Sequence, residues 1–239
     1  MLKHLSQPVH RPERREAPPL RTAETVLVPP GPEPARPKSG PNLLNNASFE
    51  SGQAYFYDDT RERAVPMGWA LTFHDANTQA LPRQAAPFGR PITALINSHS
   101  VAAADRGRVF AGGVFCWKLA GGSSPVWVRL TQTVAGLEPG RRYRFSVNLL
   151  PDVIARTHPQ IAYAADPLSV EALQTATFGE QAFASGWKAG GDMPPGRYTR
   201  LALDFTAPGP RGEVALEIRG RWALPLGAWY IDELSLAPV

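Results

Sequence analysis

The side chains that could perform acid–base or nucleophilic chemistry lie in two short stretches. A glycosidase needs two carboxylates about 5 to 10 Å apart. Asp58 and Asp59 are adjacent acids in the polar run YDDTRER, but a solvated loop is expected there. Ser98, His99 and Ser100 place a base beside two hydroxyls, but neighbours along an extended chain point apart, and no nucleophile-elbow motif is present. The five histidines show no metal-ligand spacing. We therefore expect a protein that is not an enzyme.

Aromatic side chains offer a second kind of chemistry, the stacking of their ring faces on sugar rings. The predicted ligand-binding residues are Tyr55 and Tyr57 in QAYFYDD, Trp117 beside a lysine, and Trp187 in the glycine-rich ASGWKAGG. The alternative for each of them is packing beneath a long loop. Trp69 follows a proline and a glycine in VPMGWALTF, and we expect it in the core.

Short strands separated by turns must position these residues. The 25 prolines and 21 glycines favour turns over long helices. Apolar and polar residues alternate at 128–134 and at 141–150, which indicates half-buried strands. Because the turn dipeptide Pro139–Gly140 lies between them, the two strands are predicted to form a hairpin-like pair.

The same alternation continues at 201–205 and 214–218, and the stretch 229–236 is a further β run. A possible N-cap at Asp166 and a proline in the first turn predict one short helix within 166–174. Short alternating strands with Pro/Gly turns are typical of a sandwich or a barrel, and one-sided alternation matches an antiparallel sandwich. We predict an all-β jelly-roll sandwich with few helical residues.

Residues 1–41 form a proline-rich segment with ten prolines between Pro8 and Pro41. Proline fixes φ and removes amide donors, so this segment is predicted to be an extended or disordered arm. One interpretation is a linker. The other is an arm that docks on a neighbouring subunit, with TVLV at 25–28 adding to an exposed sheet edge.

The charge of the chain is concentrated in that arm. Residues 1–41 hold seven Lys and Arg against four Glu, a charge of +3, which leaves +1 of the total +4 for the remainder. No clustered basic face is evident, so we expect no nucleic-acid partner. No apolar run is long enough to insert into a membrane, and no signal peptide is visible. The single cysteine, Cys116, excludes an intrachain disulfide and is expected to be a buried thiol.

Three phrases of the sequence resemble one known family when they are taken together. They are NLLNNASFESG at 42–52, LTQTVAGLEPGRRYRFSVNLL at 130–150 and WYIDELSL at 229–236. In this order they are similar to the carbohydrate-binding-module 4/9 type of galactose-binding-like jelly roll. The resemblance covers residues 42–239 and implies one jelly-roll domain there. It is more specific for the fold than for sugar binding.

The resemblance also implies a structural calcium site. In these jelly rolls the first and last strands are neighbours, so Glu50 and Asp232 are expected to lie close together and share a Ca²⁺ ion with backbone carbonyls. Asp105 is the residue available as a further acid. The alternative is that Glu50 caps a turn and Asp232 forms local hydrogen bonds.

Two functions follow from the sequence as hypotheses. The first is a non-catalytic β-sandwich module that binds a glycan, either as a carbohydrate-binding module or as a cell-surface module. The alternative is a structural or assembly protein of a virion, appendage or surface complex, which contacts neighbouring protein subunits through its N-terminal arm. Either function predicts an extracellular, cell-surface or virion-associated location, with the export route unknown.

Overall fold

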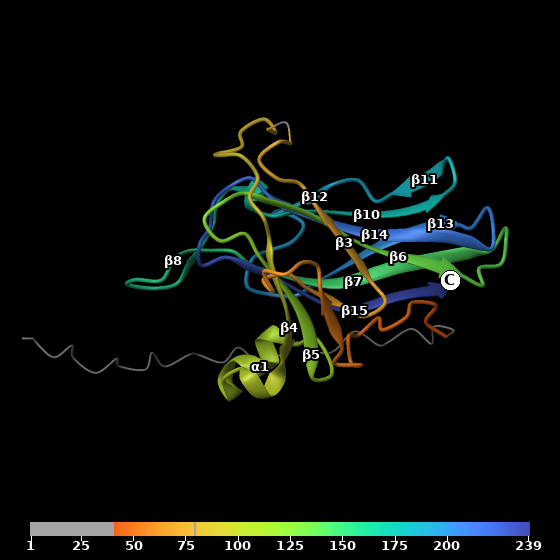
Figure 1. The fold of residues 1–239 in the computed structure, drawn as a ribbon, viewed down its shortest axis with the longest axis horizontal. Helices are drawn as coiled ribbons and strands as arrows, with labels where there is room; N and C mark the ends of the chain where they lie inside the picture. The colour runs from red at the N-terminus through yellow and green to blue at the C-terminus, as the bar shows by residue number, and fades with distance from the viewer. Residues whose placement is uncertain (1–40, 79) are drawn as a thin grey trace, which may run out of the picture. The chain divides into compact units, whose positions relative to one another are not determined.

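A computed structural model describes residues 41–78 and 80–239 of the chain. The predictions made for the arm, including the strand-like stretch 25–28, lie outside the described residues. Two antiparallel sheets pack face to face (Figure 1), which confirms the predicted all-β sandwich. The described residues include no helix long and apolar enough to cross a membrane.

The first sheet has six strands in the order β11-β10-β14-β6-β3, with β12 also paired to β10. The second has five strands in the order β13-β7-β15-β5-β4. The six-stranded sheet comprises β3 (Ala70–Phe73), β6 (Val126–Ala135), β10 (Glu171–Phe178), β11 (Gln181–Ala184), β12 (Lys188–Ala189) and β14 (Arg211–Gly220). The five-stranded sheet comprises β4 (Ile92–Asn97), β5 (Phe115–Ala120), β7 (Arg142–Asp152), β13 (Thr199–Thr206) and β15 (Ala228–Pro238).

Short elements connect the sheets. Two small ribbons pair β1 with β2 and β8 with β9. The elements outside the two large sheets are β1 (Ala54–Phe56), β2 (Ala64–Pro66), β8 (Ile154–Arg156), β9 (Ala162–Tyr163), α1 (Ala103–Val109), and the 3-10 turns η1 (Ser98–Ser100) and η2 (Pro167–Ser169).

Alternation along each strand builds the core between the sheets. On β6, Val128, Leu130, Gln132 and Val134 are buried, and the residues that alternate with them face outward. Successive side chains of a strand point to opposite faces of the sheet, so one face of each sheet is apolar and packs against the other. Trp69, expected in the core, is 3% exposed. The lone thiol of Cys116 is also buried, as expected.

The predicted hairpin-like pairing of 128–134 with 141–150 is wrong. The first stretch belongs to β6 and the second to β7, which lie in different sheets. The turn itself is present, with Gly140 at φ +80° and its amide bonded to the carbonyl oxygen of Ala207. Alternation determines which residues face the core, but it does not determine which strand is the neighbour, and here the chain crosses from one sheet to the other.

The predicted helix within 166–174 is reduced to a single turn. The Asp166 carboxylate accepts a hydrogen bond from the amide of Leu168, as an N-cap does, but the chain is extended again at Val170. The alternating residues that follow pair with β14 as strand β10. The period-two pattern and its pairing partner outweigh the local helix-start signal. The helix α1 was not predicted.

The two ends of the sandwich lie against each other. The amide of Leu43 donates to the carbonyl oxygen of Leu236 at 2.8 Å. The side chain of Asn42 accepts from the amide of Leu236 and donates to the carbonyl oxygen of Leu234. The opening NLL phrase is therefore fastened to the last strand, which agrees with the neighbouring ends that the resemblance implied.

Candidate functional site

The outer face of the six-stranded sheet carries a group of polar and aromatic side chains that could contact a ligand. Strand register aligns the outward residues in rows across the strands. The first row is Trp127, Arg219 and Glu171, from β6, β14 and β10. The second row is Thr72, Arg129, Glu217 and Leu173, and the third is Ala70, Thr131, Ala215, Thr175 and Ala184. Large side chains thus stand at one end of the face, and small ones follow.

Aromatic rings gather around the first row. The ring of His74 lies 4.0 Å from that of Trp127, centroid to centroid, and the ring of Trp187 lies 6.1 Å from it at a steep angle. The guanidinium carbon of Arg219 is 3.5 Å from the Trp187 ring centroid and 5.3 Å from that of Trp127. A guanidinium over a tryptophan ring is a favourable cation–π contact. The arginine therefore fixes both indoles, which remain partly accessible.

A buried ion network holds that arginine. The carboxylate of Glu171 accepts two hydrogen bonds from Arg219 and two from Arg221, at 2.8 to 3.0 Å. Arg219 is only 8% exposed and Glu171 only 3%. Burial alone would raise the pKa of Glu171, but the hydrogen bonds and charges of the two arginines outweigh burial and lower it. The carboxylate is therefore ionised at neutral pH and keeps both guanidinium groups in place.

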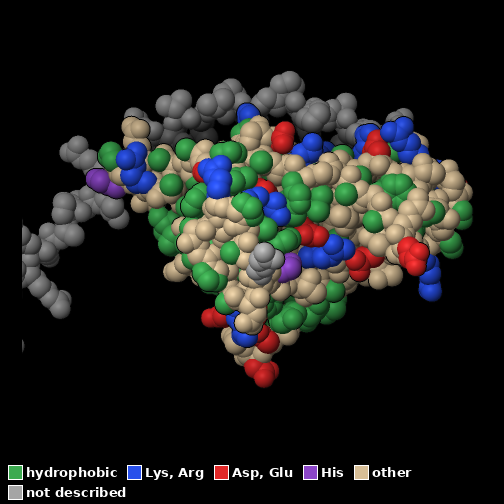
Figure 2. All heavy atoms as spheres, turned by 90° about the horizontal axis from the view of Figure 1, so that it is seen from above, with side chains coloured by type: hydrophobic (Ala, Val, Ile, Leu, Met, Phe, Trp, Pro, Cys, Tyr) green, Lys and Arg blue, Asp and Glu red, His purple; other side chains and the backbone are tan. Residues whose placement is uncertain are grey.

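A second, more accessible network follows in the next rows. The Arg129 guanidinium bridges Glu217, at 2.7 Å, and Glu213, at 3.0 Å. The indole N–H of Trp127 donates to the other oxygen of Glu217. Arg129, Arg219 and Arg221 are thus each paired with carboxylates of Glu171, Glu213 or Glu217. The view in Figure 2 likewise shows acidic and basic side chains interspersed.

The segment between β3 and β4 borders this face at the Trp127 end. The amide of Gly89 donates to the carbonyl oxygen of Pro125, and the amide of Ala85 donates to that of Arg221. Arg83 pairs with Asp166 at 2.6 Å. These contacts connect the segment to residues before β6, after β14 and before β10 in turn. It therefore forms a wall across the end of the sheet, beside the two tryptophans.

The predicted ligand-binding residues fall into three places. Trp187 lies on the outer face just described. Tyr55 on β1 and Tyr57 just after it are 38% and 46% exposed. Trp117 is fully buried and its indole N–H donates to the carbonyl oxygen of Ala64. The prediction for Trp117 is wrong, because the residue sits at an inward position of β5, opposite Ile231, and packs in the core.

Sequence reasoning missed Trp127 and Arg219 of the first row. Trp127 alternates with buried valines on β6 and therefore points outward. The alternation of β14 placed Arg219 outward as well, and that signal was readable from the sequence. Its approach to Trp187 was not readable, because the contact depends on how the segment after β11 folds back over the sheet.

Of the three acids of the implied calcium site, Glu50 and Asp232 bond to one loop, residues 111–115, and Asp105 lies outside that loop on α1. The carboxylate of Glu50 accepts the amides of Val114 and Phe115, both at 2.9 Å. Asp105 lies on α1, near Arg108. Gly113 makes the Glu50 contact possible, because its φ is +60° and a Cβ there would lie 2.2 Å from a Glu50 oxygen.

Asp232 is bonded in the same way to the same loop. One of its oxygens accepts the amides of Ala111 and Gly112, and the other accepts that of Glu233. Burial raises the pKa of Asp232 to about 7, although the amide hydrogen bonds oppose the shift. Amide N–H groups are partners for anions and not for a cation. No group of three His, Cys, Asp or Glu residues in the described chain could hold a metal ion.

The arrangement therefore does not fit the implied calcium set. In its place, one backbone loop bridges the acid near the first strand and the acid in the last strand. The expectation of calcium binding thus rests on the family resemblance alone.

The candidate catalytic residues are also placed. Asp58 accepts hydrogen bonds from Thr60 and from the buried Arg63, and the Thr60 bond is the largest cause of its lowered pKa. His99 lies in η1, where its amide donates to the side chain of Asn97. Asp58 thus has a structural role in the β1–β2 turn.

Comparison with solved structures identifies the architecture. A family 61 carbohydrate-binding module, solved with β-1,4-galactotriose, superimposes with a TM-score of 0.50 and 12% identity over 84% of this chain and 100% of that module. The fold is that of a carbohydrate-binding-module-like β-sandwich. This confirms the resemblance at the level of the fold.

Weaker matches have TM-scores under 0.5. They include the xylan-binding CBM22-1 domain of Paenibacillus barcinonensis Xyn10C, at 0.43 and 12% identity over 85% of this chain and 97% of that one. Another is tailspike protein 4 of bacteriophage CBA120, at 0.44 and 14% identity over 83% of this chain and 21% of that one. No protein-family model and no curated protein matches this chain by sequence.

Proposed function

We propose that this protein is a non-catalytic module that binds a carbohydrate chain on the outer face of its six-stranded sheet. The observation that carries the proposal is the Trp127–Arg219–Trp187 cluster, held by a buried carboxylate and open on one side to rows of small and polar residues. Sugar rings present apolar faces and hydroxyl edges, and this surface offers indoles for the first and hydrogen-bonding groups for the second.

The pairing of these three arginines favours an uncharged sugar. Arg129, Arg219 and Arg221 are each paired with a carboxylate of the same face. An anionic ligand would have to compete with those carboxylates, whereas hydroxyl groups can accept from and donate to the pairs without separating them. The proposed ligand is therefore a neutral polysaccharide or oligosaccharide.

The similar solved structures support the proposal, and one of them indicates which ligand to test first. The family 61 module was solved with a galactotriose, and such a β-linked neutral oligosaccharide is the first ligand to test. A polysaccharide ligand would also agree with work outside the cell or at a cell or virion surface. The alternative, an assembly protein that docks through its arm, rests on residues outside the described chain, and the comparisons do not favour it.

The proposal is tested by calorimetry and affinity electrophoresis with soluble β-galactan, xylan and mixed-linkage glucan, using polygalacturonate as the charged comparison. We expect one of the neutral polymers to bind and Trp187→Ala to weaken that binding by at least about tenfold, equivalent to about 1.4 kcal/mol. The matched control is Phe56→Ala, which removes an aromatic ring that is 53% exposed on β1.

Equal binding by wild type and Trp187→Ala would contradict the proposal for this face. Binding of polygalacturonate in preference to every neutral polymer would contradict the argument from charge. Turnover of any of these polymers, measured as released reducing ends, would contradict the non-catalytic role.

A further inference from the structure

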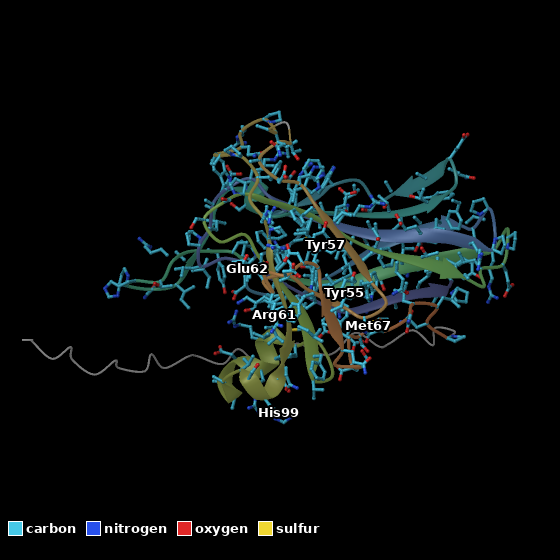
Figure 3. The ribbon with its side chains drawn as sticks, in the orientation of Figure 1. Tyr55, Tyr57, Arg61, Glu62, Met67 and His99 are labelled. Carbon is cyan, nitrogen blue, oxygen red and sulfur yellow. The ribbon has the colours of Figure 1, made fainter. Side chains whose placement is uncertain are left out.

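The β1–β2 hairpin carries a strip of exposed side chains that the outer-face cluster does not include. Tyr55 and Tyr57 are 38% and 46% exposed, and Met67, just after β2, is 44% exposed. Figure 3 shows the three following one another along the hairpin, while His99 lies apart on another element. Tyr55 lies on β1, and Tyr57 is the first residue after that strand.

This strip runs beside β3, the edge strand of the six-stranded sheet. The Tyr55 hydroxyl donates to the carbonyl oxygen of Trp69 at 2.9 Å, just before β3 begins. The Tyr57 ring lies 5.4 Å from that of Phe73, where β3 ends. Between these two contacts, Ala70 and Thr72 are exposed, and they are the β3 members of the third and second rows. Both rows therefore end at β3, the strand that the hairpin contacts.

The hairpin is held firmly, although its outer side chains are exposed. Arg63 is 1% exposed; it bonds to Asp58 across the turn and to the carbonyl oxygen of Pro91 before β4. The carbonyl oxygen of Ala64 accepts the indole N–H of the buried Trp117. A surface that is already ordered loses little conformational entropy when it binds a ligand.

We propose that the hairpin strip is a second sugar-contacting segment, continuous with the outer-face site, that is occupied by the far end of the same carbohydrate chain. This inference rests on the proposed function. A protein occupant fits less well, because three side chains are far fewer than the roughly 20 to 30 residues per side of a protein interface.

In this geometry, the contribution of the strip to binding affinity depends on the length of the ligand. Strands lie about 4.8 Å apart, so the rows from β10 to β3 span roughly 14 Å before the hairpin is reached. A short oligosaccharide seated by the tryptophans ends on the sheet. A longer one continues past β3 and can stack on Tyr55 and Tyr57.

The experiment measures affinity for a ladder of oligosaccharides, from disaccharide to hexasaccharide, of whichever neutral polymer the wild-type protein binds. The variants are Tyr55→Ala/Tyr57→Ala, Trp187→Ala and the control Phe56→Ala, whose ring is next to Tyr55 on β1 and points to the other side of that strand. We expect the double variant to bind the hexasaccharide about tenfold more weakly and the shortest ligand that binds with unchanged affinity. Trp187→Ala is expected to weaken binding at every length.

Each failure has its own signature. Loss at all lengths for Trp187→Ala together with no loss at any length for the double variant would overturn this inference and leave the proposed function intact. An equal loss for short and long ligands in the double variant would also overturn it. No binding by the wild-type protein would overturn the proposed function and this inference with it. Where the double variant has a lowered melting temperature, Met67→Lys probes the same strip from the neighbouring strand, and unchanged hexasaccharide affinity in that variant would count against the strip.

Discussion

Each outer face of the sandwich holds one carboxylate between two arginines, but the two sites differ in burial. On the six-stranded sheet, the side chains of Glu171, Arg219 and Arg221 are 4%, 10% and 12% exposed. On the five-stranded sheet, Asp204 is 24% exposed and its two arginine partners on β7 are 47% and 61% exposed. The chemistry is the same, yet one triad is covered by aromatic rings and the other faces water.

The difference shows what the covering segments contribute. Trp187 shields the Glu171 triad from water, so the charges there interact strongly and leave an unpaired charge if one of them is removed. The pairs of Asp204 with Arg142 and Arg144 are screened by water and salt, and such surface pairs contribute little. The buried triad is therefore a rigid base for a binding site, whereas the exposed one is an ordinary surface network.

The largest effect is expected for Glu171→Gln. The amide keeps the shape of the side chain but leaves Arg219 buried without a counter-charge, so the free energy of unfolding should fall by about 3 to 5 kcal/mol. Urea denaturation followed by tryptophan fluorescence measures the change. A loss below about 1 kcal/mol would show that the triad is as well solvated as its exposed counterpart.

The next largest effect is expected from low pH, which should remove the stability that the Glu171 triad contributes. The pKa of Glu171 is lowered, so the stability it contributes is present above its ordinary pKa of about 4.3 and is lost as the pH falls through the lowered value. The comparison is made by thermal melts of wild type and Glu171→Gln from pH 7 to pH 2. We expect the stability difference between them to shrink below about pH 4. A difference that stays constant over this range would mean that the carboxylate charge is not what stabilises the fold.

Asp204→Asn is the matched substitution on the other face and should have a small effect. The hydrogen bond from Arg144 is the largest cause of the lowered pKa of Asp204, but all partners are solvated, so a loss of roughly 0.2 to 1 kcal/mol is expected. The same urea experiment measures it, and raising the salt concentration should reduce the loss further. A loss comparable to that of Glu171→Gln would remove the contrast between the two faces.

Calcium should have the smallest effect of all. Glu50 and Asp232 are bonded to the amides of residues 111–115, so we expect the melting temperature to be the same in excess calcium and in EDTA. A melting temperature that rises with calcium concentration would show that a native-state site exists and would restore the expectation drawn from the family resemblance.

Much of the fold was predictable because alternation and turn residues are local signals. The stretch 128–134 was correctly predicted as a strand with an inward apolar face, and the three phrases at 42–52, 130–150 and 229–236 indicated the right architecture. Strand partners were not predictable from alternation, which is why 141–150 was paired with the wrong neighbour. The pattern states which face a residue takes and leaves the sheet unspecified.

The candidate site was predictable only in part, for a related reason. Trp187 was selected from its glycine-rich surroundings, but its contact with Arg219 joins segments that are 32 residues apart in sequence. Trp117 has the same apparent qualifications and is buried, because its strand position points inward. An aromatic residue in a sequence reveals its stacking capacity, while its accessibility depends on the tertiary packing around it.

The meeting of Leu43 with Leu236 has a practical consequence for handling the protein. Because the ends of the sandwich are adjacent, a short peptide could join them and new ends could be opened at an exposed turn, such as the one between β13 and β14. Such a circular permutant should refold to the same sandwich. The adjacent ends would also allow the sandwich to be inserted as a domain into a surface loop of another protein.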